Sequence, residues 1–201
     1  MIKPNVIKNY QEYFVETAEQ RILEVLFRIP DKEFSLSDLA KLSKTAKANI
    51  GKILNKLEKR EILEIERLSK IWRIRANRQN SIFKNLKRIY NLSFIYQSGI
   101  IEFLNEYYSR PKSIILFGSF RKGEDISTSD IDIAIETSED IDIETFDITD
   151  QFTEWAHKDW KLFFKLRKIQ ILKFNRGRID INLFNNVANG FVLYGFLEVK
   201  P

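Results

Sequence analysis

Two apolar runs joined by a short polar segment constrain the fold of this chain more than any other feature. The first run, Ser113–Phe117, ends in Gly118-Ser119, and ten residues later Asp130-Ile-Asp132 opens the second run. Side chains two positions apart on a strand point the same way. The pattern therefore predicts a strand, a turn and a second strand that presents two carboxylates on one face of a sheet.

These residue types suit chemistry on phosphates. Two carboxylates on one face repel each other unless a positive charge lies between them, and a divalent cation supplies that charge best. A glycine-serine turn leaves room for a phosphate to approach backbone N–H groups at the start of the next helix. Phosphate, Mg²⁺ and paired carboxylates together indicate nucleotidyl transfer. The alternative is an ordinary half-exposed strand that buries its isoleucines and turns its acids to water.

The segment resembles the signature of the DNA polymerase β-type nucleotidyltransferase superfamily, and in particular that of the minimal nucleotidyltransferases. Their pattern is Gly-Ser-x-Ala-Arg-Gly, followed at a fixed distance by Ser-Asp-Ile-Asp. The chain departs from it at Arg121 and Lys122, which keep positive charge beside the expected phosphate site. It matches at Gly118, Ser119, Gly123, Ser129, Asp130, Ile131 and Asp132.

The resemblance implies Mg²⁺-dependent transfer of a nucleoside monophosphate from a nucleoside triphosphate, ATP being expected, to an acceptor. It implies two Mg²⁺ ions held by Asp130, Asp132 and a third carboxylate on a later strand beside them. The predicted third catalytic and metal-binding carboxylate is Asp180, between two isoleucines in Arg178–Phe184. The alternative for Asp180 is an edge-strand acid that faces solvent. The nucleotide-binding residues are predicted to be Gly118, Ser119, Lys122 and Ser129.

The order of elements around this motif is also predicted. A helix that ends near Tyr108 is expected to pack against the sheet. After Pro111 we expect a strand, a helix, a strand, a helix, a hairpin and a closing strand. Their residues are 113–117, 119–124, 130–136, about 143–158, 168–174 paired with 178–184, and 191–194.

The first part of the chain shows helical periodicity and then a short hairpin. Three helices and two strands are predicted at residues 17–29, 37–42, 45–60, 62–65 and 71–74. Thr17 and Ser37 are the expected caps of the first two helices, and Ser43 or Thr45 opens the third. This order of elements resembles the winged helix-turn-helix domains of small transcription regulators.

The charge distribution supports that comparison. The net charge of +5 divides unevenly, because residues 1–110 carry 21 basic and 13 acidic side chains and residues 111–201 carry 12 and 15. Residues 41–88 hold 15 basic against 4 acidic side chains, which favours contact with DNA phosphates. The alternative is a solvated lysine-rich face or a winged helix that binds protein. The predicted DNA-binding residues are Lys44, Thr45, Lys47, Asn49, Lys52, Lys56, Arg73 and Arg75.

The fold class follows as α+β, with an N-terminal winged helix-turn-helix and a C-terminal polymerase-β-like nucleotidyltransferase domain of mixed sheet and helices. The predicted boundaries are 1–78 for the winged helix, 79–110 for a helical connector and 111–201 for the nucleotidyltransferase domain. Gly99 should divide the connector into two helices. The first of them is apolar enough to pack against a second copy, so a homodimer is a candidate assembly.

Composition excludes several other classes of site. The chain has no Cys, so it has no disulfide, thiol nucleophile or thiolate metal site, and its single His157 excludes a multi-histidine zinc centre within one chain. No apolar run reaches transmembrane length, and residues 1–5 lack the apolar stretch of a secretory signal. A cytoplasmic protein without membrane contact is the expectation.

The expected partners are DNA, a nucleoside triphosphate and an acceptor. Many minimal nucleotidyltransferases act as antitoxins beside a small helical toxin of the HEPN type, and some adenylylate a tyrosine on it. The resemblance therefore implies a HEPN-type protein as a candidate acceptor, although no residue identifies the acceptor. The alternative function is a DNA-binding transcriptional regulator whose nucleotidyltransferase fold is catalytically silent or only senses nucleotide.

Overall fold

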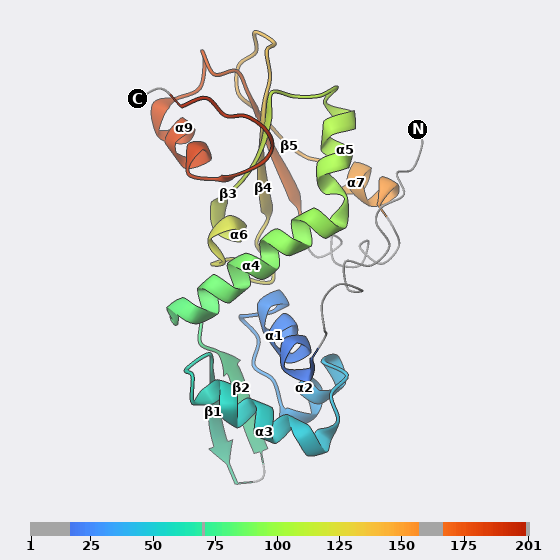
Figure 1. Cartoon of the computed structure of the whole chain (residues 1–201), viewed down its shortest axis with the longest axis vertical. Coiled ribbons are helices and arrows are strands. Elements are labelled where there is room, and N and C mark those ends of the chain that lie inside the picture. The colour runs from blue at the N-terminus through green and yellow to red at the C-terminus, as the bar shows by residue number, and fades with distance from the viewer. Residues whose placement is uncertain (1–16, 70, 157–166, 200–201) are drawn as a thin grey trace. The chain divides into compact units, whose positions relative to one another are not determined.

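The computed structural model describes residues 17–69, 71–156 and 167–199. The chain divides into two compact units (Figure 1), one ending at Tyr90 and the other beginning at Asn91. This boundary falls within helix α4 (Ser81–Ser98), so the first part of α4 belongs to the N-terminal unit and the rest to the C-terminal unit. None of the helices in the described ranges has the length and apolar character needed to cross a bilayer.

The N-terminal unit has three helices followed by a hairpin, which is the winged helix-turn-helix order predicted from the sequence. The helices are α1 (Ala18–Arg28), α2 (Leu36–Leu42) and α3 (Lys47–Glu58), and the antiparallel strands are β1 (Leu63–Leu68) and β2 (Ile71–Ala76). The hairpin of β1 and β2 is the wing of this fold. Phe34 forms an isolated antiparallel bridge with Ile74, so a single residue from outside the hairpin also pairs with β2. The core contains Ile22, Leu26, Leu39, Ile50, Leu54 and Leu57, all fully buried.

The ends of these helices follow local capping chemistry, with two corrections to the sequence prediction. Thr17 caps α1 in a capping box with Gln20, as expected. The cap of α2 is Ser35 and not Ser37, because the Ser35 hydroxyl accepts the N–H of Asp38. Helix α3 begins at Lys47 without a side-chain cap, so neither Ser43 nor Thr45 opens it.

The connector consists of two helices as predicted. Gly99 lies between α4 and α5 (Ile100–Tyr107) with a φ of 77°, a left-handed conformation that glycine adopts without steric cost. Phe103 and Leu104 of α5 are buried in the core of the C-terminal unit, against β3. This confirms that the second connector helix packs on the sheet.

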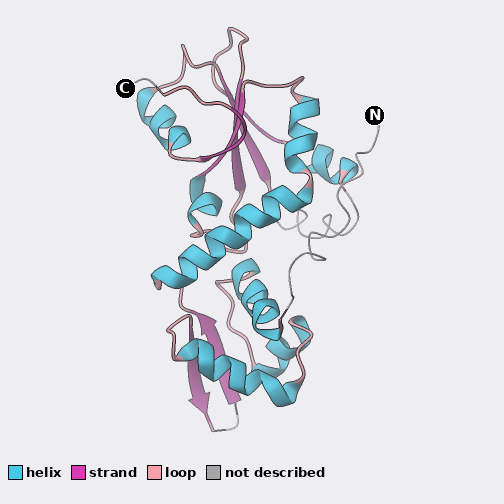
Figure 2. Ribbon diagram, viewed as in Figure 1, coloured by secondary structure: helices cyan, strands magenta, loops and turns pink. Residues whose placement is uncertain are grey.

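The C-terminal unit is built on one mixed five-stranded sheet (Figure 2), with the order β5-β6-β4-β3-β7. Strands β4 and β6 are parallel, whereas the other neighbouring pairs are antiparallel. The strands are β3 (Ser113–Phe117), β4 (Ile131–Glu136), β5 (Glu144–Asp147), β6 (Ile169–Phe174) and β7 (Phe191–Gly195).

Both faces of this sheet carry an apolar core. On one face Ile131 and Ile133 join α5 and α7 (Thr149–Trp155) in a single cluster. On the other face Ala134, Leu172 and Phe174 pack with α9 (Ile181–Ala188). Figure 1 shows α5 and α7 on one side of the strands and α9 on the other. The structure is therefore α+β, a mixed sheet flanked by helices, as predicted.

Two predicted elements of this unit are wrong. The expected helix at about 143–158 begins instead as the edge strand β5, and helix α7 starts only at Thr149; residues 157 and 158 lie outside the described part of the chain. The expected second strand of a hairpin at 178–184 is the start of α9. Ile179, Leu183 and Val187 recur at helical spacing and all pack into the core under α9, so burial favours the helix over the alternating strand.

Candidate functional site

The predicted carboxylate pair lies at the edge of the sheet where β3 ends and β4 begins. Asp130 directly precedes β4, and Asp132 is its second residue, paired with Phe117 at the end of β3. Ile131 and Ile133, on either side of Asp132 in the strand, point into the core that contains α5. The side chain of Asp132 therefore lies on the opposite face of the sheet, together with Ala134, which packs with α9. Both carboxylates are half-buried. The structure thus places them next to the Gly118-Ser119 turn, as predicted.

Gly118 and Asp132 are in direct contact. The φ of Gly118 is +71°, and a Cβ added there would overlap Oδ2 of Asp132 and stand 2.9 Å from its Cγ. Only glycine fits here, because residues with a side chain rarely adopt this positive φ and because Asp132 leaves no space for a Cβ. The turn therefore brings backbone directly beside a carboxylate, with Ser119 next to it at the start of α6 (Gly118–Lys122).

The electrostatics of the pair favour a bound cation. Burial raises the pKa of Asp132, and the charge of nearby Asp130 raises it further. Ionising Asp132 is therefore costly in the protein alone, and a divalent cation beside the two carboxylates would relieve both causes. This chemistry fits one metal ion together with phosphate oxygens.

A buried ion pair supports the loop between α6 and β4. Arg167 Nη1 donates to Asp125 Oδ2 at 2.7 Å, and the two side chains are only 3% and 0% exposed. Asn91 Nδ2 donates both to Asp125 Oδ1 at 2.7 Å and to the carbonyl of Phe120 at 2.8 Å. These contacts fix the segment that joins the glycine turn to Asp130. No sequence pattern identified them, because the partners are far apart along the chain.

The other predicted nucleotide-binding residues lie around the same turn. Lys122 is exposed at the end of α6. The Ser129 hydroxyl accepts the N–H of Ile126 at 2.9 Å, so it shapes the loop that leads to Asp130. Arg121 lies over the ring of Phe191, with 5.7 Å from its Cζ to the ring centroid. The basic segment before β6 offers Lys161 and Lys165 as alternative phosphate contacts, and both lie outside the described residues.

Asp180 does not join the carboxylate pair. It caps α9, and its Oδ1 accepts the N–H groups of Asn182 at 2.9 Å and Leu183 at 3.2 Å. Strands β4 and β6 run parallel, so β6 ends beside Glu136, at the far end of β4 from Asp132, and Asp180 follows that end. The prediction that Asp180 is the third metal ligand is therefore wrong, because the segment that carries it is a capped helix and not a strand beside β4.

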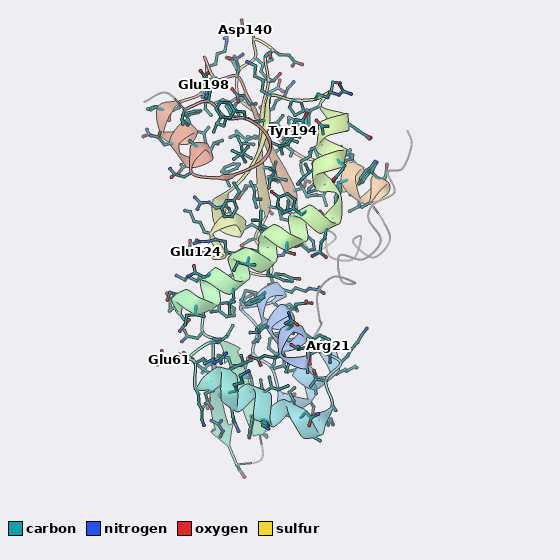
Figure 3. The ribbon with its side chains drawn as sticks, viewed as in Figure 1. Arg21, Glu61, Glu124, Asp140, Tyr194 and Glu198 are labelled. Carbon is teal, nitrogen blue, oxygen red and sulfur yellow. The ribbon has the colours of Figure 1, made fainter. Side chains whose placement is uncertain are left out.

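Contacts of the turn after β6 support this placement. Arg178 pairs with Asp140 at 2.6 Å and with Asp142 at 3.1 Å. Figure 3 shows Asp140 at one end of the C-terminal unit and Glu124, which follows α6, at the other end. Within the described ranges no three Asp, Glu or His side chains gather closely enough to hold a metal ion.

The residue beside Asp132 on the next strand is Gln170, which sequence reasoning missed. Gln170 pairs with Asp132 across the parallel β4–β6 ladder and is half-buried. On the other side of β6, Gln170 pairs with Asp147 of β5. Asp147 Oδ1 accepts the backbone N–H of Thr149 at 2.9 Å. Only the pairing of strands distant in sequence reveals this row of side chains.

The predicted DNA-binding residues occupy α3, the turn before it and the wing. Lys44, Lys47, Asn49 and Lys52 are exposed. Thr45 is buried and its hydroxyl bonds the carbonyl of Ser43, so it is not available to a groove, contrary to the prediction.

The remaining basic residues of this predicted set contact acids. Lys56 pairs with Glu19 at 2.5 Å. Arg73 and Arg75 lie 3.4 and 3.9 Å from Glu33. All three cations are exposed, so these pairs are weak and can exchange for phosphates.

Comparison with known proteins agrees with the C-terminal geometry. Residues 98–195 match the family model described as Polymerase beta, Nucleotidyltransferase. The matched range contains the glycine-serine turn, both carboxylates and the whole sheet. The C-terminal unit therefore has a polymerase-β-like nucleotidyltransferase fold, which agrees with the superfamily named from the sequence.

The remaining comparisons add little. Among solved structures, that of MepR, a transcription regulator of the Staphylococcus aureus multidrug efflux pump MepA, is similar at 12% identity. The alignment covers 49% of this chain and 77% of MepR with a TM-score of 0.32, which is too low to support an argument. The winged-helix assignment rests on the order and pairing of the elements themselves. A search of curated proteins found no match.

Proposed function

We propose that the C-terminal unit binds a nucleoside triphosphate with Mg²⁺ and that the N-terminal unit binds DNA, so that the chain is a nucleotide-responsive DNA-binding protein. The observation that supports nucleotide binding best is the direct contact between Gly118 and the Asp132 carboxylate. It puts accessible backbone, a serine hydroxyl and two acids within one small region, which suits a metal-bound triphosphate. ATP is the expected nucleotide.

Each residue has a distinct role in this proposal. Asp130 and Asp132 hold the cation, while the backbone at Gly118 and the hydroxyl of Ser119 donate to phosphate oxygens. Lys122 balances phosphate charge from the exposed end of α6. Mg²⁺, when bound, supplies charge neutralisation between the carboxylates and the phosphates.

Calorimetric titration of the full chain with ATP in the presence of Mg²⁺ tests this site. Asp132→Asn should weaken metal-dependent ATP binding by about tenfold or more, because it removes a metal ligand. Asp140→Asn is the matched control, because it removes an acid at the opposite end of the same unit. Equal ATP affinity in the wild type and in Asp132→Asn would contradict the proposal.

Nucleotidyl transfer is the second candidate function, favoured by the intact spacing of the glycine-serine turn and the carboxylate pair within the matched family region. An acceptor hydroxyl oxygen would bond to the α-phosphorus, the bond to the β-phosphate oxygen would break, and pyrophosphate would leave. The acceptor proton would pass to solvent, because Asp180 does not lie at the pair. A HEPN-type toxin is the proposed acceptor, which would make the chain an antitoxin.

Mass spectrometry distinguishes the two functions. Incubation with Mg²⁺, each nucleoside triphosphate and a HEPN-type partner should add one nucleotidyl mass to the acceptor if transfer occurs. Asp132→Ala should abolish that addition. Nucleotide binding without any added mass would leave the regulator function in place.

The DNA interface is proposed to consist of the exposed polar side chains at the start of α3 and the turn before it. Fluorescence anisotropy with duplex DNA at several salt concentrations should show steep salt dependence. The double variant Lys47→Ala, Lys52→Ala should lower the slope of log affinity against log salt by about 0.9 for each lost phosphate contact. Lys112→Ala, an exposed lysine of the C-terminal unit, is the control. Absence of any salt-sensitive DNA binding would favour a winged helix that binds protein instead.

Self-association through α4 is proposed as well. Ile82 and Ile89 are 52% and 66% exposed and lie two helical turns apart on the same face. Burying them against a second copy would remove apolar surface from water. Sedimentation should show a dimer for the wild type and a monomer for Ile89→Glu.

A further inference from the structure

We propose that Gln170 limits the carboxylate site to a single divalent cation, so that the site is built to bind nucleotide and a substitution at this one position would create a second metal site. This inference rests on the proposed nucleotide binding. It concerns the number of ions, which the carboxylate pair by itself does not determine.

The geometry follows from strand register. Gln170 is the partner of Asp132 in the parallel ladder, and neighbouring strands lie about 4.8 Å apart. The flanking pairs, Ile131 with Ile169 and Ile133 with Ile171, all belong to the core on the α5 face. Asp132 and Gln170 therefore both project from the opposite face, side by side. A carboxylate at position 170 would be close enough to share a cation with Asp132.

The chemistry of the amide explains the limit. Two divalent ions in one site lie about 3.5–4 Å apart, and their repulsion must be offset by carboxylates around both. Gln170 offers one neutral carbonyl oxygen and an NH₂ group that donates and cannot bind a cation. Asp130 and Asp132 with phosphate oxygens satisfy one Mg²⁺, which needs few protein carboxylates.

No neighbouring acid of the described chain substitutes for the missing ligand. Asp147 follows on β5, two strand spacings and so about 10 Å from Asp132, and it is engaged by Thr149 and Lys168. Asp180 caps α9 beyond the other end of β6. Position 170 is therefore the place where an added carboxylate would complete a second site.

The test counts Mn²⁺ ions bound to the full chain in the presence of a non-hydrolysable ATP analogue, by electron paramagnetic resonance and calorimetry. The wild type should bind one ion. The isosteric Gln170→Glu, or Gln170→Asp if the former folds poorly, should bind two ions. Its affinity for the second ion should exceed the affinity of the wild type for a second ion by about tenfold or more. Gln170→Asn should behave as the wild type.

A charge-matched control separates ligation from general electrostatics. Thr145→Glu adds the same charge at an exposed position of β5, opposite Leu172 and not opposite Asp132. It should leave the count at one ion. A second ion in both acidic variants would overturn the inference, since position 170 would then have no special role.

The outcomes also separate this inference from the function on which it rests. One ion in the wild type and one in Gln170→Glu would overturn the role of Gln170 while leaving nucleotide binding intact. No ion in the wild type but binding in Gln170→Glu would overturn the single-cation limit and also metal-dependent nucleotide binding by the native site. No ion in either protein would overturn both.

Discussion

The two units of this chain differ in how far apart along the sequence their paired strands lie. In the N-terminal unit the paired strands β1 and β2 follow each other, and α3 precedes them and contacts β1. In the C-terminal unit β4 pairs with β6, and β3 pairs with β7 from the far end of the chain. Local patterns therefore predict the order of elements in the first unit, whereas the environment of Asp132 depends on pairing between distant strands.

Ion pairs show the same difference between the units. Arg67 and Glu58, 2.6 Å apart in the N-terminal unit, are nine residues apart in sequence and exposed to water. Asp125 and Arg167, 2.7 Å apart in the C-terminal unit, are buried and separated by 42 residues. Water screens the first pair, while the second has only its protein partners to compensate its charge.

The largest expected effect comes from breaking the buried pair. Asp125→Ala removes the carboxylate that pairs with the buried Arg167 at 2.7 Å and should lower the stability of the C-terminal unit by about 3–5 kcal/mol. Hydrogen exchange should show lost protection after residue 91 and unchanged protection in residues 17–90. Glu58→Gln, which breaks the exposed pair, should change protection very little. Equal loss of protection in both units would contradict an effect confined to the C-terminal unit.

A smaller effect is expected from a methyl group at the glycine turn. Gly118→Ala should cost about 1–3 kcal/mol, because it forces alanine to a positive φ and against the Asp132 carboxylate, and it should abolish ATP binding. Gly51→Ala is the control in the N-terminal unit, where the nearest atom is 3.9 Å away and the helix favours alanine. The control should gain stability by up to about 1 kcal/mol in thermal denaturation.

The pH dependence of stability tests the electrostatics at Asp132. Because its pKa is raised above the ordinary value of 3.8, the folded protein holds the proton to higher pH than the unfolded chain does. Stability is therefore lost as pH rises from that value through the pKa of the folded state. Asp132→Asn should melt higher than the wild type at pH 7 without divalent ions, and this advantage should vanish at pH 3. A constant difference across pH would contradict the assigned cause.

The smallest expected effect concerns the wing. Glu33→Gln removes the acid that lies near both Arg73 and Arg75 and should raise DNA affinity by up to about fivefold, as expected for exposed pairs. Anisotropy measured at one fixed salt concentration checks this. Unchanged or weaker binding would indicate that the two arginines do not face DNA phosphates.

How well the sequence predicts each part of this site depends on how far apart along the chain the interacting residues lie. The turn at Gly118 and the pair Asp130 and Asp132 were placed correctly, because strand alternation and a short connection fix them locally. Asp180 was misplaced because its stretch fits both an alternating strand and an amphipathic helix, and burial of Leu183 and Val187 favoured the helix. Gln170 carried no signal, since a neutral side chain on a strand matches no motif.

The winged-helix order, the nucleotidyltransferase motif and the juxtaposition of turn and carboxylates follow from the amino-acid sequence, because each depends on residues close along the chain. Which side chain lies beside Asp132, and which buried groups bond to Asp125, became known only from the three-dimensional fold. Strand register and burial set these neighbours, and both depend on the whole sheet because each strand pairs with partners that lie far away in sequence.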